Sequence, residues 1–247
     1  MNNTIDVFGV PVASLTMDET VSYILSKVEE RKTLQHVVVN AGKLVAMQKD
    51  VLLKNSVLDA DLINADGQAV VWASKLLGQP LPERVAGIDL MLNLVQMAHD
   101  KGLKCFFLGA KEEVLKKVVD IFSEKYSPDI IGGYRNGYFK EGEEAEIAKD
   151  ICNSGAHLLF VAISSPKKEI FVNKYKSIMN VPFVMGVGGS FDVVAGITKR
   201  APLWMQKVGL EWFYRFLQEP KRMWKRYLIG NSKFILLVFK EKFKSKK

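Results

Sequence analysis

The fold is decided by one stretch, residues 157–189, which reads HLLFVAISSPKKEIFVNKYKSIMNVPFVMGVGG. Two apolar runs in it, His157–Ile163 and Phe183–Val187, have the length of buried strands. Between them, Lys167–Ile178 has the pattern of a helix. A strand, a helix and a second strand in this order are typical of a parallel sheet, because parallel neighbours need a crossover connection.

The same alternation continues through the first 190 or so residues. Further strands are predicted at Ile5–Val7, His36–Val39, Asp61–Asn64, Lys104–Leu108 and Asp129–Ile131. Further helices are predicted at Met17–Glu30, Leu44–Leu53, Gln68–Leu77, Ile88–Lys101, Glu112–Tyr126 and Glu143–Asn153. Thr16 and Glu19 have the spacing of a capping box at the first helix. We therefore expect an α/β fold, with a Rossmann-like, mostly parallel sheet and helices on both faces.

The last fifth of the chain differs in charge and in aromatic content. Residues 199–247 hold 14 Lys and Arg against three acidic residues, whereas residues 1–198 hold 21 basic and 24 acidic ones. Three of the four Trp also lie in this tail. Basic residues interleaved with aromatic ones suit a membrane interface or a phosphate-bearing lipid. We expect a core at residues 1–198 and a basic helical appendage at 199–247, with helices that break at Pro220 and near Gly230.

Composition excludes several classes of protein. The longest strongly apolar run of the tail, Phe234–Phe239, has six residues, and a membrane-crossing helix needs roughly 20. The N-terminus has no pattern of a secretion signal. Cys105 and Cys152 read as buried thiols of a reducing compartment, and the three scattered histidines predict no metal site. The tail aromatics match no nucleic-acid-binding module. The sequence thus predicts a cytoplasmic protein that lies on a membrane surface.

Several predicted strands end in loops that could hold a ligand, because ligands of open α/β sheets collect at the carboxyl ends of strands. Asp66 could act as a general base, but it could also cap the helix that begins at Gln68, which is the more ordinary role. Arg84 could bind an anion or be solvated. The run Gly186-Val187-Gly188-Gly189 could hold a phosphate, although glycines after a strand more often form a tight turn.

A series of motifs runs in order through nearly the whole chain. It comprises Ala65-Asp66-Gly67, Val70-Val71-Trp72, Leu81-Pro82-Glu83-Arg84-Val85, Gly87-Ile88-Asp89-Leu90, Gly132 to Phe139, Ser165-Pro166-Lys167-Lys168-Glu169, Val187-Gly188-Gly189-Ser190-Phe191-Asp192, Lys199-Arg200-Ala201-Pro202, Leu210-Glu211-Trp212, Arg215, Glu219-Pro220-Lys221-Arg222 and Arg226-Tyr227. This series resembles the signature of the WecG/TagA/CpsF glycosyltransferases.

The resemblance implies transfer of N-acetylmannosamine, or a related N-acetylhexosamine, from a UDP donor to polyprenyl-diphosphate-linked N-acetylglucosamine. That step belongs to the synthesis of wall teichoic acid or another bacterial surface polysaccharide, at the inner face of the cytoplasmic membrane. The resemblance also implies inversion at the anomeric carbon, no metal and no other cofactor, and a tail that acts as a lid in contact with the membrane. A homo-oligomer is compatible with it.

The implied chemistry assigns roles to particular residues. An inverting transferase needs a base for the acceptor hydroxyl, and Asp66 is the candidate. Arginines must then stabilise the departing UDP diphosphate, because a guanidinium binds phosphate oxygens bidentately. The arginine candidates are Arg84 in the core and Arg215, Arg222 and Arg226 in the tail. The other expected substrate-binding residues are Asn40, Gly67, Gly109, Lys168, Gly186, Gly188 and Gly189.

Three positions depart from the family pattern. Val38 stands where Thr is expected, Gly42 where Glu is common, and Lys168 where Gln is usual. These changes leave a second hypothesis open, a catalytically impaired relative that binds a nucleotide sugar or a lipid diphosphate as a scaffold. Lys168 itself has two interpretations: it binds a diphosphate, or it forms an ion pair with Asp66 that lowers the pKa of the base.

Overall fold

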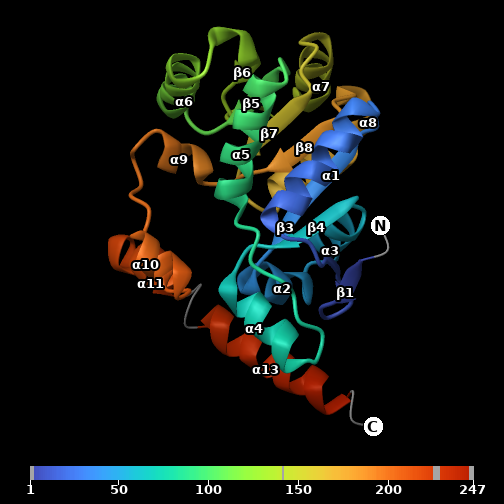
Figure 1. The fold of residues 1–247 in the computed structure, drawn as a ribbon, viewed down its shortest axis with the longest axis vertical. Coiled ribbons are helices and arrows are strands. Elements are labelled where there is room, and N and C mark those ends of the chain that lie inside the picture. The colour runs from blue at the N-terminus through green and yellow to red at the C-terminus, as the bar shows by residue number, and fades with distance from the viewer. Residues whose placement is uncertain (1–2, 141, 225–228, 245–247) are drawn as a thin grey trace.

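The computed structural model describes residues 3–140, 142–224 and 229–244 (Figure 1). Its centre is a six-stranded sheet with the strand order β4-β3-β8-β7-β5-β6, in which every neighbouring pair is parallel. The strands are β3 (Leu34–Val39), β4 (Leu62–Ala65), β5 (Cys105–Gly109), β6 (Ile131–Arg135), β7 (Leu158–Ala162) and β8 (Phe183–Gly186). The predicted α/β class with a parallel sheet is confirmed.

Helices cover both faces of the sheet, and the strands are continuously apolar for that reason. Successive side chains of a strand point to opposite faces. Thus Phe107 of β5 packs into one hydrophobic cluster, whereas Phe106 and Leu108 pack into another. The helices over the first cluster are α1 (Met17–Glu29), α5 (Gly87–Asp100), α6 (Glu112–Lys125) and α9 (Ser190–Val194). Those over the second are α7 (Glu144–Asn153) and α8 (Lys167–Met179).

A third hydrophobic cluster lies at the β3–β4 end of the sheet. It includes a small antiparallel pair, β1 (Thr4–Asp6) with β2 (Pro11–Ala13), and the helices α2 (Ala41–Met47), α3 (Val51–Leu58) and α4 (Gln68–Leu76). The predicted strand at Ile5–Val7 therefore exists in part, but it lies outside the main sheet. Its partner β2 was not predicted, because three residues give too short an alternating pattern.

Two predicted boundaries are wrong for local reasons. The single helix expected at Leu44–Leu53 is two helices, because each has its own N-cap. The side chain of Asn40 accepts from the N–H of Lys43 at the start of α2. The side chain of Asp50 accepts from the N–H of Leu53 at the start of α3. The strand expected at Asp129–Ile131 is a short 3₁₀ turn followed by β6. The capping box of Thr16 and Glu19 is confirmed at the start of α1.

The described part of the tail forms four helices, α10 (Leu203–Lys207), α11 (Glu211–Gln218), α12 (Pro220–Trp224) and α13 (Gly230–Lys244). Helix boundaries fall at Pro220 and Gly230, as predicted. Helix α13 packs against α2. It lies at one end of the molecule (Figure 1) and inserts Phe234 and Val238 into the third hydrophobic cluster. The ring of Phe234 meets that of Phe8 edge to face, with centroids 5.7 Å apart. The last helix is thus held by core packing.

Candidate active site

A cavity of about 600 Å³ opens where β3, β4 and β8 end. These strands are neighbours in the sheet, so the residues that follow them meet at one edge. Helices α4, α5, α9, α11 and α13 and the loop residues Arg84, Arg200 and Gly209 contribute further parts of the wall. The cavity brings together seven of the residues predicted from the sequence: Asn40, Asp66, Gly67, Arg84, Gly186, Gly189 and Arg215.

Asp66 lines this cavity directly after the end of β4. Its backbone N–H donates to the carbonyl oxygen of Val39 at 2.8 Å, which extends the β3–β4 pairing by one residue. The interpretation of Asp66 as a helix cap is wrong, because Gly67 is the N-cap residue of α4 and no side chain caps that helix. Burial raises the pKa of Asp66 to about 6, and the charge of Glu211 also raises it, while Arg84 lowers it. The side chain is therefore a stronger base than an ordinary aspartate and is still ionised at neutral pH.

Arg84 is held next to Asp66 by the loop that follows α4. The N–H of Val85 donates to the carbonyl oxygen of Ala65 at 3.0 Å, which ties this loop to the end of β4. The Nη1 atom of Arg84 donates to Oε2 of Glu211 at 2.9 Å, and only 16% of the arginine side chain is exposed. The alternative of a solvated arginine is therefore wrong. Arg84 is paired with a carboxylate of the tail that lies 127 residues away in sequence.

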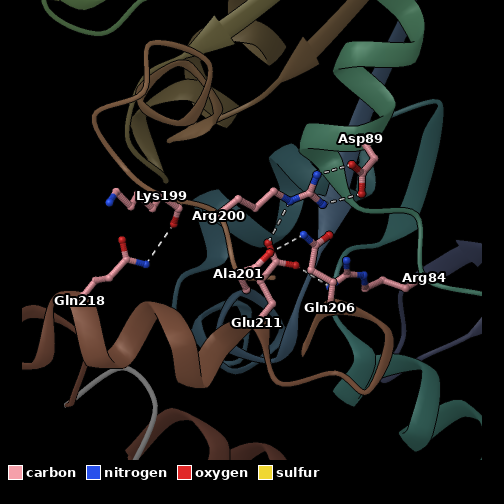
Figure 2. Close-up of polar contacts among 8 residues, drawn as sticks. All are labelled: Arg84, Asp89, Lys199, Arg200, Ala201, Gln206, Glu211 and Gln218. Atoms are coloured by element: carbon pink, nitrogen blue, oxygen red, sulfur yellow. Dashed lines mark hydrogen bonds and ion pairs between the residues drawn. The ribbon is translucent and has the colours of Figure 1, made fainter. Parts of the chain in front are cut away.

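A second arginine continues this ion pair across the tail (Figure 2). Arg200 donates from Nη1 and Nη2 to the two oxygens of Asp89 at 2.5 and 2.7 Å, and its Nε lies 3.5 Å from Oε1 of Glu211. Arg84, Glu211, Arg200 and Asp89 thus form a row of alternating charges. The row joins the loop after α4, helix α5 and the beginning of α11, and so fixes the tail over the cavity.

Arg215 reaches the glycine loop from the tail. A Cβ atom placed on Gly189 would lie 3.0 Å from Nη2 of Arg215. The Nε atom of Arg215 is buried and has no hydrogen-bond partner among the described residues. Buried donors are almost always paired, so an unpaired guanidinium N–H at a cavity wall marks a place suited to an anion.

Lys168 lies beneath the cavity and pairs with Glu169 at 3.2 Å. Lys43 pairs with the same carboxylate at 2.8 Å, and all three side chains are nearly buried. The alternative in which Lys168 forms an ion pair with Asp66 is therefore wrong. The stem of Lys168 lies against Gly186, where a Cβ atom would meet its Cε at 2.7 Å. Neither Lys168 nor Gly188 lines the main cavity, and the Nζ of Lys168 lies 3.8 Å from the Cβ position of Gly188.

The remaining predicted residues have different positions. Gly109 does not line the cavity; it is a glycine because a Cβ atom there would lie 2.6 Å from the carbonyl group of Ala162 on β7. The side chain of Arg222 and the whole of Arg226 fall outside the described part of the structure. The substituted positions Val38 and Gly42 both line the cavity.

Two charged residues of the cavity, Glu211 and Arg200, were not predicted from the sequence, although both belong to motifs of the family series. One signal was available, because Glu211 is one of only three acidic residues in a strongly basic tail. Among the described residues, no group of three or more His, Cys, Asp or Glu could hold a metal ion. No helix in the described ranges has the length and hydropathy needed to cross a membrane.

Comparison with known proteins identifies a family. The model of the glycosyl transferase WecG/TagA/CpsF family matches residues 5–247. A relative from Bacillus spizizenii is 38% identical over 188 residues, which cover 76% of this chain and 72% of the relative. A relative from Bacillus subtilis is 39% identical over the same length and the same shares. Both relatives are named N-acetylglucosaminyldiphosphoundecaprenol N-acetyl-beta-D-mannosaminyltransferase.

The parallel sheet, the edge cavity and the family match together define a glycosyltransferase. The chain belongs to the WecG/TagA/CpsF family, and the resemblance found in its motifs is confirmed.

Proposed function

We propose that the protein transfers N-acetylmannosamine from a UDP donor to N-acetylglucosamine linked to undecaprenyl diphosphate, with inversion at the anomeric carbon. The names of the two Bacillus relatives support the sugar and the acceptor. The arrangement of Asp66, Arg84 and Arg215 around one cavity supports the mechanism. Wall teichoic acid or a related bacterial surface polymer is the product class that follows.

Asp66 serves as the general base. In a single displacement, the acceptor hydroxyl attacks the anomeric carbon while its proton passes to a carboxylate and the bond to the UDP oxygen breaks. A base is most effective when its pKa is near the working pH, and the pKa of Asp66 is raised to about 6. Deprotonated Asp66 therefore accepts the proton. The configuration at the anomeric carbon inverts because only one displacement occurs.

Arg84 and Arg215 bind the diphosphate of the donor. Both line the cavity, Arg84 from the loop after α4 and Arg215 from α11. A guanidinium stays charged throughout and can form two parallel hydrogen bonds to phosphate oxygens. The unpaired buried Nε of Arg215 is the donor that such an anion would satisfy. The charge that develops on the leaving UDP is thereby stabilised without movement of the protein backbone.

The observation that carries this proposal is a buried carboxyl with a raised pKa in the same cavity as two arginines. The test is an assay of UDP release and disaccharide-lipid formation from UDP-N-acetylmannosamine and a lipid-diphosphate-N-acetylglucosamine. We expect Asp66→Asn to abolish turnover and Arg215→Ala to reduce it by about 100-fold, the usual cost of losing one transition-state donor. Full turnover in Asp66→Asn would exclude the assigned base. No described feature favours the non-catalytic scaffold over an active enzyme.

The tail supplies the contact with the membrane in this proposal. Three apolar residues of α10 and α11 are more than half exposed: Leu203, Trp204 and Leu217. Basic residues lie near them on the same helices. Exposed apolar groups beside cations suit the headgroup region of an anionic bilayer. The protein then acts at the membrane surface, where a lipid-linked acceptor is found.

Vesicle sedimentation tests the membrane contact. Truncation at Arg200 is unsuitable, because it would remove Phe234 and Val238 from the third hydrophobic cluster. A double change of Leu203→Ser and Trp204→Ser should release the protein from vesicles that contain phosphatidylglycerol. The control is Tyr138→Ser, which alters an exposed aromatic residue outside the tail. Equal binding by all three proteins would place the membrane contact elsewhere.

A further inference from the structure

The cavity has two ends of different chemistry. The charged side chains that line it are Asp66, Arg84, Arg200, Glu211 and Arg215, and none of them comes from α4 or α13. The lining side chains of α4 and α13 are mostly apolar: Trp72, Ala73 and Leu76 from α4, and Phe234, Ile235, Val238 and Phe239 from α13. Gln68 and Asn231 are the polar residues that these two helices add. A ligand that fills the whole cavity must therefore be anionic or polar at one end and hydrocarbon at the other.

Two apolar ridges form the walls of this second end. Residues four apart lie on one face of a helix, so Trp72 and Leu76 form a ridge on α4. Ile235 and Phe239 form a ridge on α13 in the same way. The four side chains are between 44% and 53% exposed, whereas the adjacent Phe234 is buried. The two ridges line the same cavity and leave apolar surface open to it.

We propose that the groove between α4 and α13 binds the first isoprene units of the acceptor lipid. This inference rests on the proposed function. Of the two substrates, a nucleotide-sugar donor has no hydrocarbon part, whereas the acceptor of the relatives carries an undecaprenyl chain on its diphosphate. The apolar end is continuous with the polar end that holds Asp66, so one acceptor molecule can place its sugar hydroxyl at the base and its chain in the groove.

The groove also explains why α13 is fixed to the core. Phe234 and Val238 anchor the helix in the third hydrophobic cluster, and this leaves Ile235 and Phe239 facing the cavity. Without that anchor one wall of the groove would be lost. Tail docking and lipid recognition are thus coupled, because the same helix turns provide both contacts.

The test compares the binding of two ligands in the absence of detergent. Both are N-acetylglucosamine diphosphates, and one carries a farnesyl group where the other carries a methyl group. Each methylene moved from water to an apolar site strengthens binding roughly fourfold, so we expect the wild type to prefer the farnesyl ligand by at least about tenfold. Ile235→Asn should remove most of this preference and leave affinity for the methyl ligand unchanged. The control is Leu236→Asn, because Leu236 is 68% exposed and does not line the cavity.

The outcomes separate the inference from the proposed function. An equal affinity of the wild type for both ligands would overturn the groove assignment, and so would an equal loss of preference in Ile235→Asn and Leu236→Asn. Turnover is measured in the same samples. A farnesyl preference that depends on Ile235 in a protein without turnover would support the groove and contradict the proposed function. Unchanged thermal unfolding of both variants confirms that the fold is intact.

Discussion

The raised pKa of Asp66 has a consequence for stability that can be measured apart from activity. In the unfolded chain the carboxyl has its ordinary value of 3.8, and in the fold its pKa is about 6. The folded state therefore binds the proton more tightly, and ionisation above pH 6 works against folding. The difference of roughly two pKa units corresponds to about 3 kcal/mol in the free energy of unfolding. This penalty is fully present above pH 6, decreases between pH 6 and 4, and disappears below the unfolded pKa.

Replacement of Asp66 by Asn removes the ionisable group with little change in shape. We expect Asp66→Asn to be inactive and yet more stable than the wild type by about 2–3 kcal/mol at pH 8, or about 4–12 °C in Tm for a chain of this size. The gain should shrink steadily as the pH is lowered from 6 to 4. Thermal unfolding at several pH values measures it.

The control is Asp120→Asn on the exposed face of α6, which should change stability by less than about 0.5 kcal/mol at any pH. An unchanged or lower Tm of Asp66→Asn at pH 8 would refute the reasoning. A gain that is the same at pH 8 and pH 4 would do so as well, since it would not arise from ionisation.

Three further predictions follow from single contacts. Glu211→Gln should move the acid limb of the pH profile of kcat/KM to lower pH, because the charge of Glu211 raises the pKa of Asp66. An acid limb at the same or a higher pH would contradict this. Phe234→Ala should destabilise the protein by about 3 kcal/mol or expose the amides of α13 to hydrogen exchange, since it empties a buried site; unchanged exchange and Tm would show that α13 is held by other contacts. Gly109→Ala should lower Tm far more than Gly78→Ala. Both glycines have positive φ, but only a Cβ on Gly109 would lie 2.6 Å from the backbone of Ala162. Equal effects in urea unfolding would mean that the close contact between Gly109 and Ala162 is unimportant.

Much of the site was predictable because it depends on strand order along the chain. Asn40, Asp66 and the glycine run each follow a strand, and parallel strands end at one edge. The choice between base and helix cap for Asp66 was not predictable, because both roles use the same residue at the same place. The structure excludes the cap role, because Gly67 takes the cap position itself. The pairing of Lys43 with Glu169 was also hidden, since these two residues are 126 residues apart in sequence.

The sequence alone determined the parallel sheet, the helices on its two faces and the breaks in the tail at Pro220 and Gly230. These features depend on local periodicity and on residues that cannot continue a helix, so short stretches are sufficient to specify them. Only the tertiary structure decided that Glu211 pairs with Arg84, that Arg215 reaches Gly189, and that α13 forms one wall of an apolar groove. Such contacts depend on how helices far apart in the chain pack together, and no local pattern encodes which of many charged or apolar residues will meet.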